Sequence, residues 1–90
     1  MKITKKVMCG SVESGDILVT FEPSEKPGLE IRLTSTFAKQ FHDNILEIVQ
    51  ETLKENQIDQ GVVILNDQGA LPGAIKARVL TAIQRMGETK

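Results

Sequence analysis

Between Leu29 and Thr34 the chain runs LEIRLT, a segment in which apolar and polar side chains alternate without a break. Alternation with a period of two is typical of a β-strand and places Leu29, Ile31 and Leu33 on one face. The other face carries charged and hydroxyl side chains. We therefore expect a strand that is covered on one side only.

The hydrophobic period changes directly after this strand. Apolar residues recur at spacings of three and four from Phe37 to Leu53, which predicts an amphipathic helix. Its apolar stripe consists of Phe37, Phe41, Ile45, Ile48, Val49 and Leu53. The hydroxyl side chains of residues 34–36 can cap its start, and Asn56 is the expected left-handed residue at its end.

Two more elements follow this helix. The run Val62–Leu65 is apolar on both faces, as expected for an interior strand. A second helix is predicted from about Pro72, a favoured first-turn residue, to Met86, with Gly87 ending it. Its inward side chains are expected to be Ile75, Val79, Ala82, Ile83 and Met86.

Upstream, two short strands are predicted over Lys6–Val12 and Ile17–Glu22. Residues 13–16 lie between them, and the pair Ser14-Gly15 suits a two-residue hairpin connection because glycine tolerates a positive φ. The element order is therefore β-β-β-α-β-α. Two helices with single apolar stripes need one sheet face to cover, so we predict an α+β two-layer sandwich, a four-stranded sheet with both helices on one face, as a single domain over residues 1–90.

Composition excludes several classes of function. Eleven basic and twelve acidic residues in a chain of 90 give a net charge of −1, which argues against a duplex nucleic acid partner. Aromatic residues for base stacking are absent from the predicted outward sheet positions, which are Leu18, Thr20, Glu30, Arg32 and Thr34. The single cysteine excludes an internal disulfide. No apolar run approaches a membrane span and no signal-peptide core is visible, so we expect a cytoplasmic protein without membrane contact.

Catalytic and metal-binding candidates are few. The only histidine, His42, has no recognisable nucleophile or orienting carboxylate near it in sequence, and Cys9 lies in an apolar strand as expected for an inert thiol. Asp59 and Asp67 sit in predicted turns without metal-ligand spacing. The loop Gly69–Gly73 lacks the Lys-Ser/Thr end of a phosphate-binding loop. The three phenylalanines are expected in the core.

The cations of the last helix permit two interpretations. Lys76, Arg78 and Arg85 follow one another along it, and Arg32 lies on the third strand. Such scattered charges usually form a solvated face. The alternative is a docking patch for an acidic or phosphate-bearing partner, which we would place on the side of Arg78 and Arg85.

The turn Glu13-Ser14-Gly15-Asp16 is the remaining candidate site. A serine at the tip of a hairpin is usually only a turn residue. It is also exposed, accessible to a modifying enzyme and held off the body of the domain, which are the needs of an attachment hydroxyl. The carboxylates of Glu13 and Asp16 could help a transferase to recognise the tip, and Ser11 is the next candidate acceptor.

The segment Gly10–Ile17 resembles the N-terminal signature of the acyl carrier (γ) subunit of citrate lyase. Further similarity is carried by Lys39-Gln40-Phe41 with Ile45, by Gly61-Val62, by residues 67–71 and by Ala77-Arg78-Val79, in the same order over nearly the whole chain. The pairing of Glu-Ser-Gly-Asp with a downstream Asp-x-Gly-Ala-Leu is the more specific part of this resemblance.

The resemblance implies a carrier without catalytic residues of its own. Ser14 would be esterified through a phosphate to 2'-(5''-phosphoribosyl)-3'-dephospho-CoA, with Glu13, Gly15 and Asp16 completing the attachment turn. A dedicated holo-citrate-lyase synthase installs this group in the family. The thiol of the arm, rather than Cys9, carries acetyl and citryl thioesters between an α subunit that exchanges citrate for acetate and a β subunit that cleaves citryl thioester to oxaloacetate.

Three alternatives remain open at this point. The related carrier subunit of malonate decarboxylase has the same kind of arm. An unmodified interaction module that docks on a larger enzyme would share the fold but would not need Ser14. A single-strand nucleic-acid-binding domain is disfavoured by the missing aromatics and the acidic balance of charge.

Overall fold

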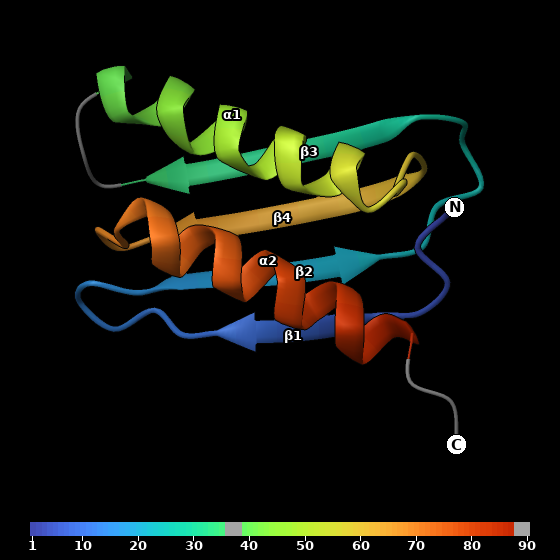
Figure 1. Cartoon of the computed structure of the whole chain (residues 1–90), viewed down its shortest axis with the longest axis horizontal. Coiled ribbons are helices and arrows are strands. Elements are labelled where there is room, and N and C mark those ends of the chain that lie inside the picture. Colours follow the sequence, from blue (N-terminus) through green and yellow to red (C-terminus); the bar gives the residue numbers. More distant parts are fainter. Residues whose placement is uncertain (36–38, 88–90) are drawn as a thin grey trace.

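The computed structural model of the chain describes residues 1–35 and 39–87. Its elements, labelled in Figure 1, are β1 (Val7–Gly10), β2 (Ile17–Glu22), β3 (Leu29–Ser35), α1 (Lys39–Glu55), β4 (Gly61–Asp67) and α2 (Pro72–Gly87). The predicted order β-β-β-α-β-α is confirmed. The expected contributions of Thr36 to the cap of α1 and of Phe37 to its apolar stripe lie outside the described residues.

The four strands form one sheet in the order β1-β2-β4-β3. The β1–β2 and β2–β4 pairs are antiparallel, whereas β3 and β4 run parallel and are connected through α1. β4 has a neighbour on each side, as predicted for an interior strand, but only its inward residues Val63 and Leu65 are fully buried, whereas Val62 and Ile64 are half-buried. The outer position of β3 explains why its inward residues Leu29, Ile31 and Leu33 are only partly buried.

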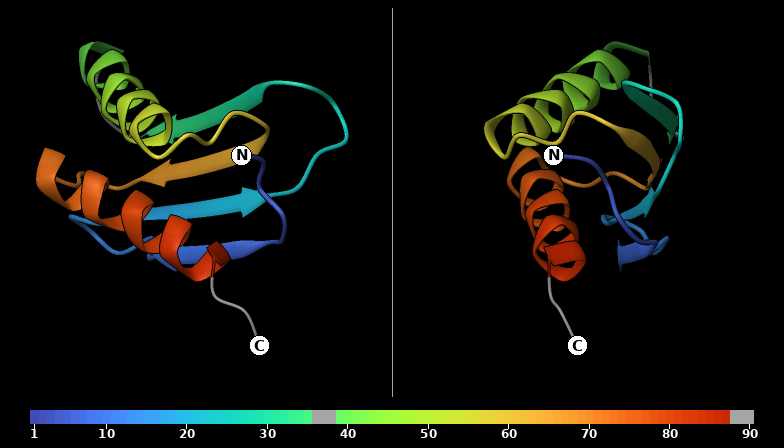
Figure 2. Two further views of the ribbon diagram at one scale, coloured as in Figure 1. Left: turned by 45° about the vertical axis from the view of Figure 1, so that its right-hand side comes forward. Right: turned by 90° about the vertical axis from the view of Figure 1, so that its right-hand side faces the viewer.

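Both helices pack on the same face of the sheet, and the other face carries no described element (Figure 2). The core between the layers is built from side chains of both helices and all strands except β3, which packs against its edge. The fully buried side chains include Phe21, Ile17, Val19, Val49, Leu53, Val63, Leu65 and Val79. The two-layer sandwich predicted from the sequence is confirmed.

The sheet register brings two chain connections to one end of the molecule. Asp67, the last residue of β4, pairs with Ile17 at the start of β2 on one side and with Ser35 at the end of β3 on the other. The β1–β2 connection and the β4–α2 connection therefore meet there, on the left of Figure 1, together with the first turns of both helices.

Three details of the sequence-based prediction were wrong. β1 ends at Gly10 rather than Val12, because the backbone of Gly10 leaves the extended region (φ 97°) and passes close to the carbonyl of Ile17. The connection between β1 and β2 therefore spans residues 11–16 instead of the predicted 13–16. Phe41 was expected in the core, yet it is 49% exposed.

The end of α1 also differs from the prediction. The left-handed residue is Gln57 (φ 63°), one position after Asn56. The amide of Ile58 donates to Leu53 O (2.9 Å) and the amide of Gln57 donates to Lys54 O (3.0 Å), which together form a Schellman motif. Asn56 serves instead through its side chain, which donates to Thr52 O at 2.8 Å.

Candidate functional site

Ser14 and Gly15 occupy the two central positions of a β-turn. The amide of Asp16 donates to Glu13 O at 3.0 Å, and Gly15 has a φ of 87°, which is the geometry of a type II turn. The predicted turn is therefore present, although it lies at the tip of a longer loop. Ser14 is exposed at the position before the glycine, so its hydroxyl faces solvent at one end of the molecule.

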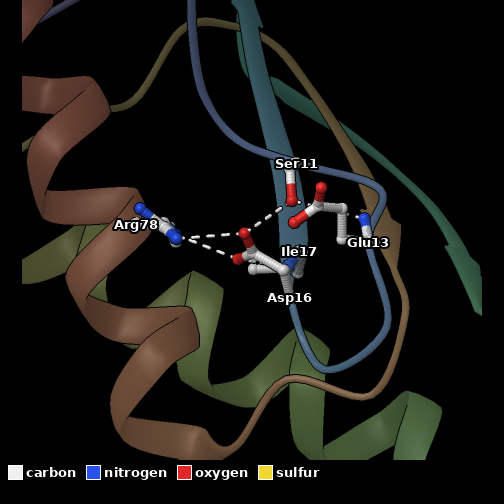
Figure 3. A network of polar contacts seen from close by, with 5 residues as sticks. All are labelled: Ser11, Glu13, Asp16, Ile17 and Arg78. Atoms are coloured by element: carbon white, nitrogen blue, oxygen red, sulfur yellow. Dashed lines mark hydrogen bonds and ion pairs between the residues drawn. The ribbon is translucent and has the colours of Figure 1, made fainter.

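The carboxylate of Asp16 organises the base of this loop (Figure 3). Arg78, reaching across from α2, binds it in a bidentate manner, with Nε on Oδ1 and Nη2 on Oδ2, both at 3.0 Å. The hydroxyl of Ser11 donates to Oδ2 and the amide of Ile17 donates to Oδ1, both at 2.7 Å. The Ser11 hydroxyl in turn accepts a hydrogen bond from the amide of Glu13 (3.3 Å).

These contacts keep Asp16 ionised. The hydrogen bonds from Ser11, from the Ile17 amide and from Arg78 lower the pKa of Asp16 from 3.8 to about 2, because each of them favours the carboxylate form. The hydrogen bond with Asp16 and the negative charge of its carboxylate raise the pKa of Arg78 above its ordinary value. The turn Glu13–Asp16 is thus supported by a charge-assisted, bidentate contact.

The turn also rests on the β4–α2 connection. The amide of Gly15 donates to Gln68 O (2.7 Å), and the amide of Gln68 donates back to Asp16 O (2.8 Å). The sequence-based expectation of a tip held off the body of the domain is therefore wrong: the tip is exposed, but its backbone is fixed to a second loop.

That second loop is braced by Asp67, which is 2% exposed. Its Oδ1 accepts a hydrogen bond from the amide of Ala70, and its Oδ2 accepts one from the hydroxyl of Ser35, both at 3.1 Å. Asp67 is thus a structural residue of the loop that contacts the turn Glu13–Asp16.

The structure brings the predicted site residues Glu13, Ser14, Gly15 and Asp16 together and disperses the other candidates. Cys9 is buried, His42 is half-buried on α1, and Asp59 pairs with the N-terminal amine at the opposite end of the sheet. Within the described ranges, no three His, Cys, Asp or Glu side chains cluster as metal ligands. Neither helix, as far as the chain is described, is long and apolar enough to cross a membrane.

Several supporting residues escaped the sequence analysis. Arg78 was considered only as a surface cation, whereas it holds Asp16 across a separation of 62 residues. Arg85 similarly donates to Met8 O at 2.6 Å, so both cations of the supposed docking patch are engaged within the chain. Ser11, considered as a reserve acceptor, is a half-buried brace. No local sequence pattern indicates contacts between residues so far apart in the chain.

Comparisons with known proteins show the family to which the chain belongs. A family model designated ACP and described as "Malonate decarboxylase delta subunit (MdcD)" matches residues 4–86. The chain is 42% identical over 88 residues to the citrate lyase acyl carrier protein of Clostridium perfringens (strain 13 / Type A), covering 98% of this chain and 87% of that protein. It is 39% identical over 90 residues to the citrate lyase acyl carrier protein of Streptococcus mutans, covering 100% and 88% of the two chains.

Among solved structures, the fold is similar to a chain in the crystal structure of a Pseudomonas malonate decarboxylase hetero-tetramer in complex with malonate. The TM-score is 0.76 at 26% identity, covering 92% of this chain and 84% of that chain. The expectation of a carrier rather than an enzyme agrees with the relatives, which are named as acyl carrier proteins. The chain therefore belongs to this acyl carrier family, and its relatives place it among the citrate lyase acyl carrier proteins.

Proposed function

We propose that the chain is the acyl carrier subunit of a citrate lyase and that Ser14 is the residue to which 2'-(5''-phosphoribosyl)-3'-dephospho-CoA is esterified. The observation that carries this proposal is an exposed serine on a turn whose C-terminal side is fixed, by the pair of Asp16 with Arg78 and by the two backbone hydrogen bonds with Gln68. When bound, the group supplies a thiol on a long chain that bears the acyl thioester.

The two serines of the loop differ in their availability for modification. The Ser11 hydroxyl is half-buried and donates to the Asp16 carboxylate, so modification there would break the support of the loop. Ser14 is exposed, and a bond from its Oγ to phosphorus leaves that support intact. Ser14 is therefore favoured over Ser11 as the acceptor.

The residues beside Ser14 have separate roles. Gly15 supplies the positive φ of the turn, and Asp16 holds the loop rather than meeting a transferase with a free carboxylate. The pairing with Arg78 offsets the charge of Asp16, which reduces the repulsion that a phosphate approaching Ser14 would meet. Glu13 keeps an exposed side chain and is the carboxylate available to a modifying enzyme.

The proposed partners are the citrate lyase α and β subunits and a holo-citrate-lyase synthase, in the cytoplasm. The names of the relatives support a place in citrate lyase, and the hetero-tetramer of the similar malonate decarboxylase structure supports work within a larger assembly. In this role the subunit orients and delivers the thioester, while the partners perform the chemistry.

A carrier subunit of malonate decarboxylase is the second candidate, favoured by the description of the family model and by the structural likeness. The higher identity to citrate lyase carriers, 42% against 26%, favours the first. Addition of the modified chain to carrier-free α and β subunits of citrate lyase is expected to restore citrate cleavage. If the modified chain instead restored malonate decarboxylation to carrier-free malonate decarboxylase subunits, the second candidate would be supported.

Intact-mass spectrometry tests the attachment. The protein is co-expressed with a citrate lyase holo-protein synthase and the pathway to its coenzyme precursor, beside Ser14→Ala and Ser11→Ala. We expect the mass of one phosphoribosyl dephospho-CoA group on the wild type and on Ser11→Ala, and none on Ser14→Ala. A gain on Ser14→Ala would move the site elsewhere. No gain on any variant, with the synthase active on a control carrier, would favour an unmodified docking module.

A further inference from the structure

A largely apolar cavity of about 360 Å³ opens between the N-terminal turns of α1 and α2. Its apolar walls are formed by Phe41, Ile45, Ile48, Ala70, Leu71 and Ile75. Two of these residues are also strongly exposed, Phe41 at 49% and Leu71 at 75%, so the cavity has apolar surface open to solvent. A volume of this size is at the small end of ligand-binding pockets.

The cavity lies close to the turn that carries Ser14. Gly69 lines it, and the preceding residue, Gln68, accepts the hydrogen bond of 2.7 Å from the amide of Gly15. One hydrogen bond and two peptide links thus separate Ser14 from the cavity wall, which places the Cα atoms of Ser14 and Gly69 within about 10 Å of each other. A long chain esterified to Ser14 can reach the cavity mouth.

The lining selects the kind of group that fits. Neither lysine nor arginine is among the described side chains that line the cavity, so nothing there compensates the charge of a phosphate. The exposed polar side chain of the lining is that of Asn44, which can meet an amide, whereas Asp67 is buried and bound to Ser35 and Ala70. The cavity therefore suits methylenes, methyl groups and amides, which are the chemistry of a pantetheine chain, and not the nucleotide part of the arm.

We propose that this cavity binds the thioester end of the pantetheine chain carried on Ser14 between its visits to partner active sites. This inference rests on the proposed function, because it takes its occupant from the attachment at Ser14. Tethering raises the local concentration of the chain to the millimolar range, so a weak intrinsic affinity is enough for occupancy. The bound thioester is then shielded from hydrolysis by water.

The test uses a free probe, so that it does not depend on attachment. S-acetylpantetheine is titrated into the unmodified full-length Ser14→Ala protein, and amide and methyl NMR shifts are followed. We expect saturable shifts at Ile48, Ala70 and Ile75 with a dissociation constant in the millimolar range. Leu71→Glu should weaken binding about tenfold, because it removes a wall of the cavity and adds a charge. The matched variant Leu80→Glu, at an exposed position of α2 outside the cavity, should bind like its parent.

The outcomes are distinct. Absence of saturable shifts, or equal weakening by Leu71→Glu and Leu80→Glu, overturns the cavity as a pantetheine site while leaving modification of Ser14 intact. Probe binding without any mass gain in the synthase experiment overturns the attachment, and with it the arm as occupant. In the modified wild-type protein, we expect the same shifts without added probe. Hydroxylamine, which converts the acetyl thioester to acetohydroxamate and the free thiol, should react faster with the acetylated, modified Leu71→Glu than with Leu80→Glu.

Discussion

Gly10 and Gly15 both have a positive φ, but their surroundings differ. A Cβ on Gly10 would overlap with the carbonyl oxygen of Ile17, whereas a Cβ on Gly15 would meet nothing within 4 Å. Gly15→Ala should therefore cost about 1–2 kcal/mol from backbone strain alone, and Gly10→Ala should cost clearly more because the hairpin must also shift. Urea unfolding of both variants at an unchanged m value measures the difference, and equal losses would contradict the structure.

The ionisation of Asp16 makes the support of the turn dependent on pH. Its pKa falls from 3.8 to about 2 in the folded chain, so the unfolded chain binds its proton first as the pH is lowered. The stabilisation by Asp16 is thus fully present above about pH 4 and is lost as the pH falls through about 2. In urea unfolding between these pH values, the wild type should lose more stability than Asp16→Asn.

A second carboxylate variant serves as the control for this measurement. Asp43 is exposed on α1 and takes no part in the turn, so Asp43→Asn should keep the steeper pH dependence of the wild type. If Asp16→Asn and the wild type lose stability in parallel from pH 4 to 2, the contact between Asp16 and Arg78 does not stabilise the folded state.

At the scale of elements, the site depends on the way one loop supports another. Asp67 braces the β4–α2 connection, and Gln68 in that connection holds the attachment turn. Asp67→Ala leaves the Ala70 amide without this acceptor, so we expect a loss of about 1–3 kcal/mol in the free energy of unfolding. The rate at which the synthase modifies Ser14 should also fall, because the turn loses its fixed base.

Asp59 provides the comparison for Asp67. Asp59 lies in the connection between α1 and β4, at the other end of the sheet. It is exposed and pairs with the N-terminal amine, far from the turn. Asp59→Ala should be modified at the wild-type rate, as followed by intact mass over time. A modification rate for Asp67→Ala equal to that of Asp59→Ala would show that the two loops are not coupled.

The elements that the sequence predicted well are those with long, regular periodicity. The alternation in β3 and the stripe of α1 each extend over enough residues to leave one interpretation, and the two-sided apolar run of β4 indicates its interior place. The hairpin loop was predicted too short, because Ser-Gly specifies a turn but not how far the strands reach toward it. The bend at Gly10 depends on the close approach of Ile17, which no local pattern reports.

Only the contiguous part of the site could be predicted from the sequence. The turn residues Glu13–Asp16 are contiguous, so their chemistry can be read directly along the chain. Their supports are not contiguous: Arg78 lies 62 residues beyond Asp16, and Gln68 makes its contacts through its backbone, which carries no side-chain signal. Only the folded sheet, with β2 beside β4, brings these groups together.

In the whole molecule, the candidate site lies at one end of the sheet, and the contacts of the N-terminal segment with the start of β4 lie at the other (Figure 1). The attachment turn lies where β2 begins. At the other end, the amide of Ile3 donates to Gln60 O (2.8 Å), and the Ile3 side chain, 1% exposed, fits against Gly61. The sequence analysis assigned no role to Ile3, because a single apolar residue among polar neighbours shows no periodicity.

This separation predicts that stability can be lowered without impairing the attachment site. Ile3→Ala should cost about 2–5 kcal/mol, as expected for emptying a buried position, although Ile3 belongs to no strand. Because a small domain has roughly 5–15 kcal/mol in total, the variant should still be folded at low temperature. Its modification at Ser14 there should match the wild type, since the contacts of Asp16, Arg78 and Gln68 are untouched.

Leu80→Ala, an exposed substitution on α2, should show neither loss. Urea unfolding and the time course of intact mass, measured on the same preparations, separate the two effects. Slower modification of folded Ile3→Ala would mean that the two ends of the sheet are energetically coupled and that the turn is not held by its local contacts alone.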